Sequence, residues 1–136
     1  MEREKLVFYI DGASKGNPGA AGVGVVMRDR DHNLIQKYKK YIGEATNNVA
    51  EYMALIIALQ EAVKARVREV DIYSDSELLV RQVQGTYRVK DNKLKQVYAL
   101  FENLRDYFYQ FSIKHLAREK NQEADRLANQ AVREKK

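Results

Sequence analysis

The sequence predicts an α/β fold: a mixed five-stranded sheet in which three antiparallel strands come first and parallel strands follow, with helices on both faces. Three observations predict it. Residues 6–41 consist of β-rich runs separated by short turn signals. From Asn48 the apolar residues follow a helical period instead. Beyond that helix, short β-rich runs alternate with helical stretches, as they do in parallel sheets.

The first half of the sheet is expected to be a meander. Its strands are predicted over residues 6–11, 22–30 and 34–41. The first of them is apolar on both faces until Asp11, which is typical of a central strand that ends in a carboxylate. Residues 12–21 are expected to form a loop with a tight turn at 16–19, because this stretch is rich in Gly and contains the only Pro.

The second half is expected to alternate. The helix that begins at Asn48 is apolar nearly all round, with Glu51 as the one charge in its first half, so it should be buried on most sides. The remaining elements are predicted as a strand over 70–74, helices over 75–84 and 93–109, a strand over 111–117, and a last helix capped by Asn121.

Composition limits the classes of function. The 136 residues, 45% of them hydrophobic, predict one globular domain over residues 1–136. There is no apolar run long enough to span a membrane, and the N-terminus lacks the features of a signal peptide, so a cytoplasmic protein is expected. The absence of Cys excludes disulfides and thiolate chemistry, so a metal would have to bind oxygen or His. The net charge of +5 suggests an anionic partner.

Four acidic residues are the candidate catalytic groups, although each has a structural explanation. These are Asp11, Glu51, Asp75 and Asp125. The Asp11-Gly12 pair suits a turn. Glu51 has the spacing of a capping box with Asn48, and Asp75 lies in another possible box between Ser74 and Glu77. Asp125 would lie in the first turn of the last helix, where the helix dipole favours an acid.

Their combination points to chemistry. Asp11 and Asp75 end strands that should be parallel, and Glu51 extends a buried helix face toward the same end of the sheet. Converging carboxylates repel one another unless hard divalent cations neutralise them, and four acids balance two such ions. Two Mg²⁺ or Mn²⁺ ions roughly 4 Å apart can hydrolyse a phosphodiester without a covalent intermediate. Apart from these four, 15 acids face 24 bases, which favours a polyanionic substrate.

Three other motifs are set aside. Residues 12–16 match G-x-S-x-G, but a turn and another strand follow where a serine hydrolase needs a helix. The Gly-rich stretch 12–19 lacks the Gly-Lys-Ser/Thr ending of a P-loop. An aspartyl-phosphate enzyme would be expected to carry Asp-x-Asp, and Ala13 stands at the second position.

Four segments stand out, in order and over essentially the whole chain: YIDGASKGNPG at 9–19, TNNVAEY at 46–52, YSDS at 73–76 and REKNQEAD at 118–125. Together they resemble the motifs of the type 1 ribonucleases H. The resemblance implies a ribonuclease H-like fold and hydrolysis of the RNA strand of an RNA/DNA hybrid. It also implies that Asp11, Glu51, Asp75 and Asp125 hold two Mg²⁺ ions, with Mn²⁺ as a possible substitute.

The resemblance further implies the substrate contacts. By position, the residues facing the minor groove of the hybrid would be Gly12, Ser14, Asn17, Asn47 and Asn48. Thr46 would bind a phosphate of the DNA strand, and helix N-termini are natural phosphate sites. Asparagine can both donate to and accept from the 2′-hydroxyls that distinguish RNA. A monomer without a small-molecule cofactor is expected.

The sequence also departs from the better-known members. They carry a basic protrusion with tryptophan, whereas only residues 85–92 intervene here and the chain has no Trp. This resembles the short form found in archaea and some bacteria. The protrusion could be partly replaced by a basic group of residues: Tyr87, Arg88, Lys90, Lys93 and Lys95. In those members a histidine of the last loop assists product release. Arg118, which is counted here with the substrate-binding residues, is near the position that this histidine would occupy.

Two alternatives stay open at this point. A hybrid-binding module could keep the fold and the basic surface without catalysis, although the intact acids argue against it. Another nuclease or strand-transfer enzyme of the same fold would prefer a DNA junction or DNA duplex.

Overall fold

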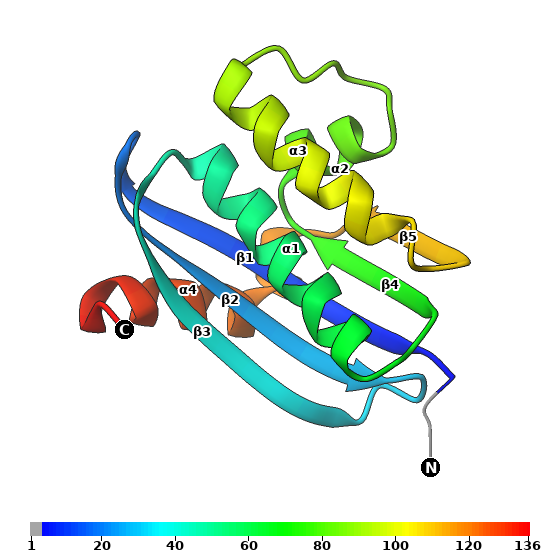
Figure 1. Ribbon diagram of the computed structural model, residues 1–136. Coiled ribbons are helices and arrows are strands. Elements are labelled where there is room, and N and C mark those ends of the chain that lie inside the picture. The colour runs from blue at the N-terminus through cyan, green and yellow to red at the C-terminus, as the bar shows by residue number, and fades with distance from the viewer. Residues whose placement is uncertain (1–3) are drawn as a thin grey trace.

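The computed structural model describes residues 4–136 and has the predicted element order. The elements are β1 (Leu6–Gly16), β2 (Gly19–Asp29), β3 (Leu34–Ala45), α1 (Asn47–Lys64), β4 (Glu69–Ser74), α2 (Glu77–Val83), α3 (Asn92–Arg105), β5 (Gln110–His115), a short 3₁₀ helix η1 (Arg118–Lys120) and α4 (Gln122–Glu134). The strands form one sheet in the order β3-β2-β1-β4-β5 (Figure 1).

The pairing directions confirm the mixed sheet. β1 pairs antiparallel with β2, and β2 with β3, whereas β1 with β4 and β4 with β5 are parallel. Ile10 and Ser74 are the last residues that β1 and β4 pair with each other. Asp11 and Asp75 therefore lie side by side just beyond this parallel pairing, although Asp11 does not end its strand as predicted, because β1 continues along β2 to Gly16.

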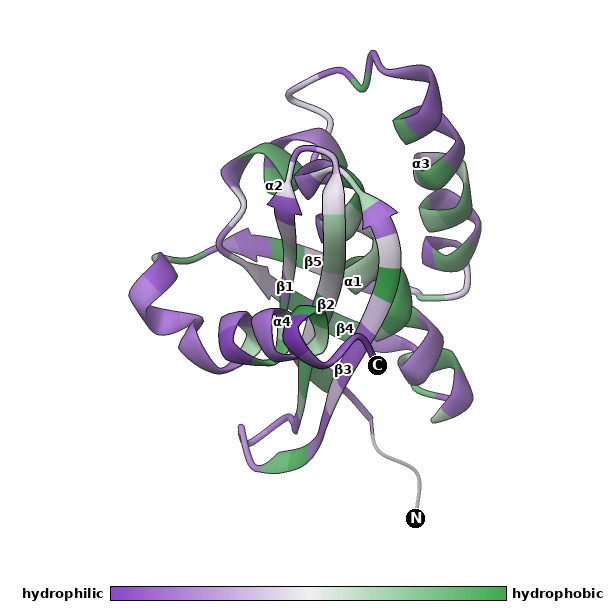
Figure 2. Cartoon of the chain, turned by 90° about the vertical axis from the view of Figure 1, so that its left-hand side faces the viewer, coloured by the Kyte–Doolittle hydropathy of each residue, from purple (hydrophilic) through white to green (hydrophobic). Residues whose placement is uncertain are grey.

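Helices cover both faces, as predicted. α1 packs on β1 and β2 with α3 beside it, and α4 packs on the opposite face against β1, β2 and β3 (Figure 1). Successive side chains of β1 point to opposite faces of the sheet, so they pack against the helices on both sides. Phe8 and Ile10 join the large core beneath α1, while Tyr9 packs with the small cluster of Val26, Ala124 and Leu127 under α4. The outward surface of α4 is mostly hydrophilic (Figure 2).

Two glycines in β2 allow α4 to approach the sheet closely. A Cβ atom at Gly24 would lie 2.1 Å from the carbonyl oxygen of Ala124, and one at Gly22 would lie 2.6 Å from that of Ala128. Any larger residue would push α4 away from the sheet. This close contact determines where the first turn of α4, which carries Asp125, lies relative to β1.

Several predicted boundaries were wrong. Residues 12–21 were expected as a loop, but β1 continues to Gly16 and β2 begins at Gly19, so only the tight turn between them is confirmed. Small residues such as Gly12 and Ala13 give no alternation signal, although they pair in register with Val23 and Gly22. β3 likewise continues beyond residue 41 to Ala45.

The predicted helix over 93–109 and the predicted strand over 111–117 also end earlier in the structure. α3 ends at Arg105 instead of residue 109 because the N–H groups of Tyr107 and Phe108 bond back to the carbonyl groups three residues earlier, in a tightening turn. β5 ends at His115, two residues before the predicted end, and the chain continues into η1.

The predicted helix caps need correction. Thr46, not Asn48, caps α1, and its hydroxyl accepts from the N–H of Val49 at 3.2 Å. Ser76 caps α2, accepting from the N–H of Leu79, so Asp75 precedes the helix and is outside any capping box. Asn121 occupies the N-cap position of α4, but its side chain makes no capping bond. Glu51 and Asp75 are thus free of the capping roles that their spacing suggested.

Among residues 4–136, no helix combines the length and the apolar composition needed to cross a membrane. The expectation of a leaderless N-terminus depends partly on residues 1–3, which lie outside the described part of the chain.

Candidate active site

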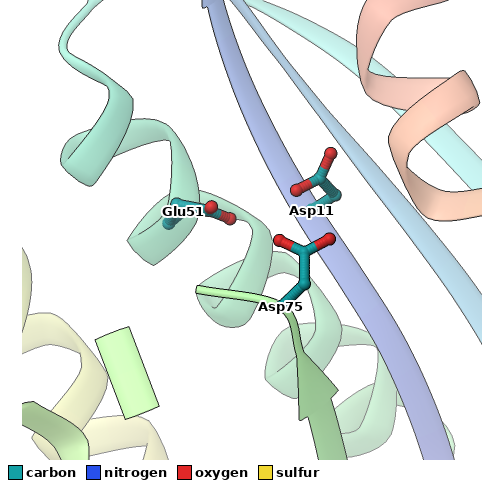
Figure 3. Close-up of side chains that lie close together, drawn as sticks. All are labelled: Asp11, Glu51 and Asp75. Carbon is teal, nitrogen blue, oxygen red and sulfur yellow. The ribbon is translucent and has the colours of Figure 1, made fainter. Parts of the chain in front are cut away.

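Three of the four predicted acids converge. Asp11 in β1, Glu51 in α1 and Asp75 just after β4 each offer a carboxylate oxygen, and these oxygens all lie within 4.8 Å of one another. Figure 3 shows the three side chains pointing toward one another from their separate elements. The sheet register brings Asp11 beside Asp75, and the packing of α1 across β1 adds Glu51.

Asp11 is almost enclosed, with 5% of its surface exposed. Burial, then the negative charges of Glu51 and Asp75, raises the pKa of Asp11 to about 9. A hydrogen bond with Asp125 and the charge of that residue contribute to the same rise. Each of these causes disfavours the ionised form, so without a counter-ion the Asp11 carboxyl is protonated at neutral pH.

Glu51 is held by the backbone of β1. Its Oε1 accepts a 2.8 Å hydrogen bond from the N–H of Gly12, 39 residues earlier in the chain. Burial raises the pKa of Glu51 to about 8, while the Gly12 bond and the positive charge of Arg118 act in the opposite direction. Glu51 thus has a backbone partner in β1 in place of the predicted capping role, and its carboxylate lies beside those of Asp11 and Asp75.

Asp125 stands at the edge of this group. It is outside the set of oxygens that lie within 4.8 Å of one another, but its hydrogen bond and charge act on Asp11. Asn129, one turn further along α4, donates from Nδ2 to both the backbone oxygen and Oδ1 of Asp125. The structure thus brings all four predicted acids to one end of the sheet.

The donor set suits hard divalent cations. Four carboxylates supply only oxygen, which Mg²⁺ and Mn²⁺ prefer. The raised pKa values of Asp11 and Glu51 mean that ionising both without a cation is unfavourable. A pair of dications would neutralise the group and return these pKa values toward their ordinary range.

The predicted substrate residues lie around the β1–β2 turn and the start of α1. The Oδ1 atom of Asn17 accepts from the N–H of Asn47 at 3.0 Å, so the turn is tied to the N-terminus of the helix. The Ser14 hydroxyl lies within hydrogen-bond reach of the carbonyl oxygens of Gly16 and Ala45.

The other predicted contacts vary in exposure. Asn47 and Asn48 are exposed, whereas Thr46, which caps α1, is half-buried. Arg118 is exposed in η1 while its charge acts on Glu51. Gly12 is buried and donates its N–H to Glu51. The structure gathers these residues at the end of the sheet that holds the acids.

One residue of this site was missed in the sequence. Asn121 was assigned only a capping role, yet its Nδ2 donates to the carbonyl oxygen of Ile10 and to Oδ2 of Asp75. The partners are 111 and 46 residues away, so no local spacing could indicate them.

Comparison with known proteins agrees with this geometry. Residues 9–131 match the family described as reverse transcriptase-like. The chain belongs to this family, among the type 1 ribonucleases H.

Two relatives and their structures make the likeness concrete. Ribonuclease HI of Halobacterium salinarum is 40% identical over 124 residues, which cover 91% of this chain and 62% of the relative. A crystal structure of RNase H1 from that archaeon superposes with a TM-score of 0.92 at 38% identity, covering 96% of this chain and 98% of that one. The structure of LC11-RNase H1 in complex with an RNA/DNA hybrid gives a TM-score of 0.89 at 41% identity, covering 95% and 97%.

Other relatives are longer. A bifunctional protein of Mycobacterium tuberculosis is 42% identical over 129 residues, which cover 94% of this chain but 35% of the relative. The chain thus spans about a third of the length of its mycobacterial relatives.

Proposed function

We propose that this protein is an endoribonuclease that hydrolyses the RNA strand of RNA/DNA hybrids with the help of two Mg²⁺ ions, for which Mn²⁺ could substitute. The observation that carries the proposal is the convergence of Asp11, Glu51 and Asp75 within 4.8 Å, with Asp125 beside them. The hybrid bound in the LC11-RNase H1 structure supports the substrate class.

In this proposal the four acids hold the cations. When bound, the cations would activate water, stabilise the leaving oxygen and neutralise the phosphate. Glu51 keeps its orientation through the Gly12 N–H, so its carboxylate faces the other acids before any substrate arrives. Such preorganisation lowers the cost of reaching the transition state. The exposed guanidinium of Arg118 adds positive charge beside Glu51, where a phosphate of the RNA strand would pass.

The rim residues are assigned to binding. Ser14, Asn17, Asn47 and Asn48 would contact the minor groove of the hybrid together with the backbone of Gly12. Thr46, at the N-terminus of α1, would bind a phosphate of the DNA strand, because the free N–H groups and the dipole of a helix end attract anions. The bond between Asn17 and Asn47 supports this assignment, since it keeps two of these residues together.

The variant Asp75→Asn tests catalysis. Replacing this carboxylate by a neutral amide removes a cation ligand, and kcat on a labelled RNA/DNA hybrid is expected to fall on the order of 10³-fold in Mg²⁺. A chelator should abolish wild-type cleavage. The hybrid, a double-stranded RNA and a single-stranded RNA are compared, and cleavage is expected for the hybrid.

Asp71→Asn is the matched control. Asp71 lies in β4, the strand that Asp75 follows, but it pairs with Lys5 at 2.8 Å and takes no part in the acid group. It should retain cleavage, provided circular dichroism shows both variants folded. Full activity of Asp75→Asn would refute the proposal. Hybrid binding without cleavage by the wild type would indicate a binding module, and preference for a DNA junction would indicate another nuclease of this fold.

A further inference from the structure

Asn121 contacts three elements that carry candidate cation ligands. It lies between η1 and α4 and is 2% exposed. Its Nδ2 donates to the carbonyl oxygen of Ile10 at 2.8 Å and to Oδ2 of Asp75 at 3.2 Å. Its backbone oxygen accepts from the N–H of Asp125 at 3.1 Å.

Each of these bonds involves one of the acids or the residue directly before it. Ile10 directly precedes Asp11, so the first bond holds the backbone from which that side chain projects. The second bond is made to the carboxylate of Asp75 itself. The third is the first backbone hydrogen bond of α4, and its donor is the N–H of Asp125. One buried residue therefore links β1, the end of β4 and the start of α4.

The chemistry of Asn121 differs from that of a residue that only stabilises a helix. An Asn at an N-cap ordinarily accepts from the backbone of the first turn, but this side chain makes no capping bond. Its Oδ1 is buried with no hydrogen-bond partner among the described residues, an unfavourable arrangement. The side chain is thus turned toward the acids at a cost to the stability of the fold.

We propose that Asn121 is a positioning residue for the cation site, holding the backbone at Asp11, the carboxylate of Asp75 and the first turn of α4 in the arrangement that binds two cations together. This inference rests on the proposed function. Residues that hydrogen-bond to metal-ligating carboxylates orient them, and their loss weakens metal affinity about 10- to 100-fold.

The test measures cation binding directly. Metal-free wild type and Asn121→Ala are titrated with Mn²⁺, and free Mn²⁺ is followed by electron paramagnetic resonance. We expect the Kd for Mn²⁺ to rise about 10- to 100-fold in the variant. The Mg²⁺ concentration that gives half-maximal cleavage should rise with it, while the KM for the hybrid at saturating Mg²⁺ changes little.

Gln110→Ala is the matched control. Gln110 also donates from its amide to a carboxylate at 3.2 Å, that of Asp71, and its carbonyl oxygen is likewise buried without a described partner. It lies at the start of β5 and pairs with Glu69, at the opposite end of β4 from Asp75. This variant should lose a similar amount of thermal stability and keep the wild-type Kd for Mn²⁺.

Wild-type Mn²⁺ affinity in folded Asn121→Ala would overturn the proposal, as would equal weakening in Gln110→Ala. If Asn121→Ala does not fold, Asn121→Ser, which retains a small polar group, is judged by the same criteria. Mn²⁺ binding does not depend on cleavage. Failure of the wild type to cut a hybrid would therefore contradict the proposed function and leave the test of Asn121 intact.

Discussion

At the scale of single residues, the site gathers carboxyl groups where water is scarce. Asp11 and Glu51 are both about nine-tenths or more buried, and the charge of Glu51 favours the protonated form of Asp11. Both lie within the same group of oxygens as Asp75. In the metal-free protein, Asp11 and Glu51 are therefore expected to be protonated, and cation binding is expected to release these protons.

This arrangement predicts the pH dependence of stability. Carboxyl groups in the unfolded chain titrate near pH 4, whereas the pKa is about 9 for Asp11 and about 8 for Glu51 in the folded chain. Between these limits the folded chain binds more protons than the unfolded one. The free energy of unfolding of the metal-free protein should therefore fall as the pH rises from 5 to 9.

Urea denaturation in the presence of a chelator measures this dependence. Asp11→Asn removes one of the two groups, so the slope should flatten and the variant should be more stable than wild type at pH 9, by more than about 1 kcal/mol. The lowered pKa of Asp71 affects stability only at acidic pH, so Asp71→Asn should keep the wild-type slope above pH 5. A metal-free stability that rises from pH 5 to 9 would contradict the geometry of the acid group.

At the scale of elements, the site depends on how closely α1 approaches β1. A Cβ atom at Gly12 would lie 2.3 Å from the carbonyl carbon of Ala50 and 2.5 Å from the nitrogen of Glu51. Only a glycine allows this contact, and the same contact places the Gly12 N–H on the Glu51 carboxylate. The requirement for glycine and the orientation of Glu51 thus share one cause.

Gly12→Ala is therefore expected to affect stability and function together. Displacing α1 should destabilise the fold by about 1–3 kcal/mol or more, because backbone atoms cannot move aside cheaply. It should also reduce kcat, because Glu51 moves with the helix. Gly43→Ala is the control: its Cβ would meet nothing within 4 Å among residues 4–136, and its φ of +80° imposes a cost of about 1–2 kcal/mol without moving α1. Wild-type kcat in Gly12→Ala would show that the approach of α1 does not position Glu51.

At the scale of the whole molecule, exposed basic residues lie beside the candidate site. Residues 85–91 and the first turn of α3 expose Arg88, Lys90, Lys93 and Lys95. An open cavity of about 240 Å³ has both Lys93 and Thr46 in its walls, so this segment lies beside the proposed phosphate contact. Tyr87 is 46% exposed. The guanidinium of Arg81 lies over its ring, 5.0 Å from the centre, in a cation–π contact.

This surface predicts the salt dependence of substrate binding. In the double variant Lys90→Ala/Lys93→Ala, KM for the hybrid should rise while kcat changes little, since the acids are untouched. The slope of log KM against log salt should decrease by about 0.7–0.9 for each phosphate that the protein no longer neutralises. Steady-state kinetics at several salt concentrations measure it.

The matched control removes the same charge elsewhere. Arg30→Ala/Lys64→Ala takes away two cations that pair with Glu4 and Glu61 instead of facing the candidate site. It should keep the wild-type slope. Equal effects in the two double variants would show that net charge, and not this segment, governs binding.

Much of the fold and site could be predicted from local pattern. The switch from β-rich runs to a helical period at residue 48 is a property of the neighbouring side chains, and so is the order of the elements that follow. The four acids could be singled out because each lies within a recognisable segment. Strand ends were less predictable, since pairing carried β1 through small residues that have no pattern of their own.

The sequence by itself thus determined the order of strands and helices and the identity of the four acids, because both depend on residues close together along the chain. Only the tertiary structure decided that Glu51 accepts from Gly12, that Asp11 is buried among like charges, and that Asn121 turns away from its helix toward Asp75. These contacts join residues 39 or more positions apart. Such distant residues meet only when the sheet register and the packing of α1 and α4 bring them together.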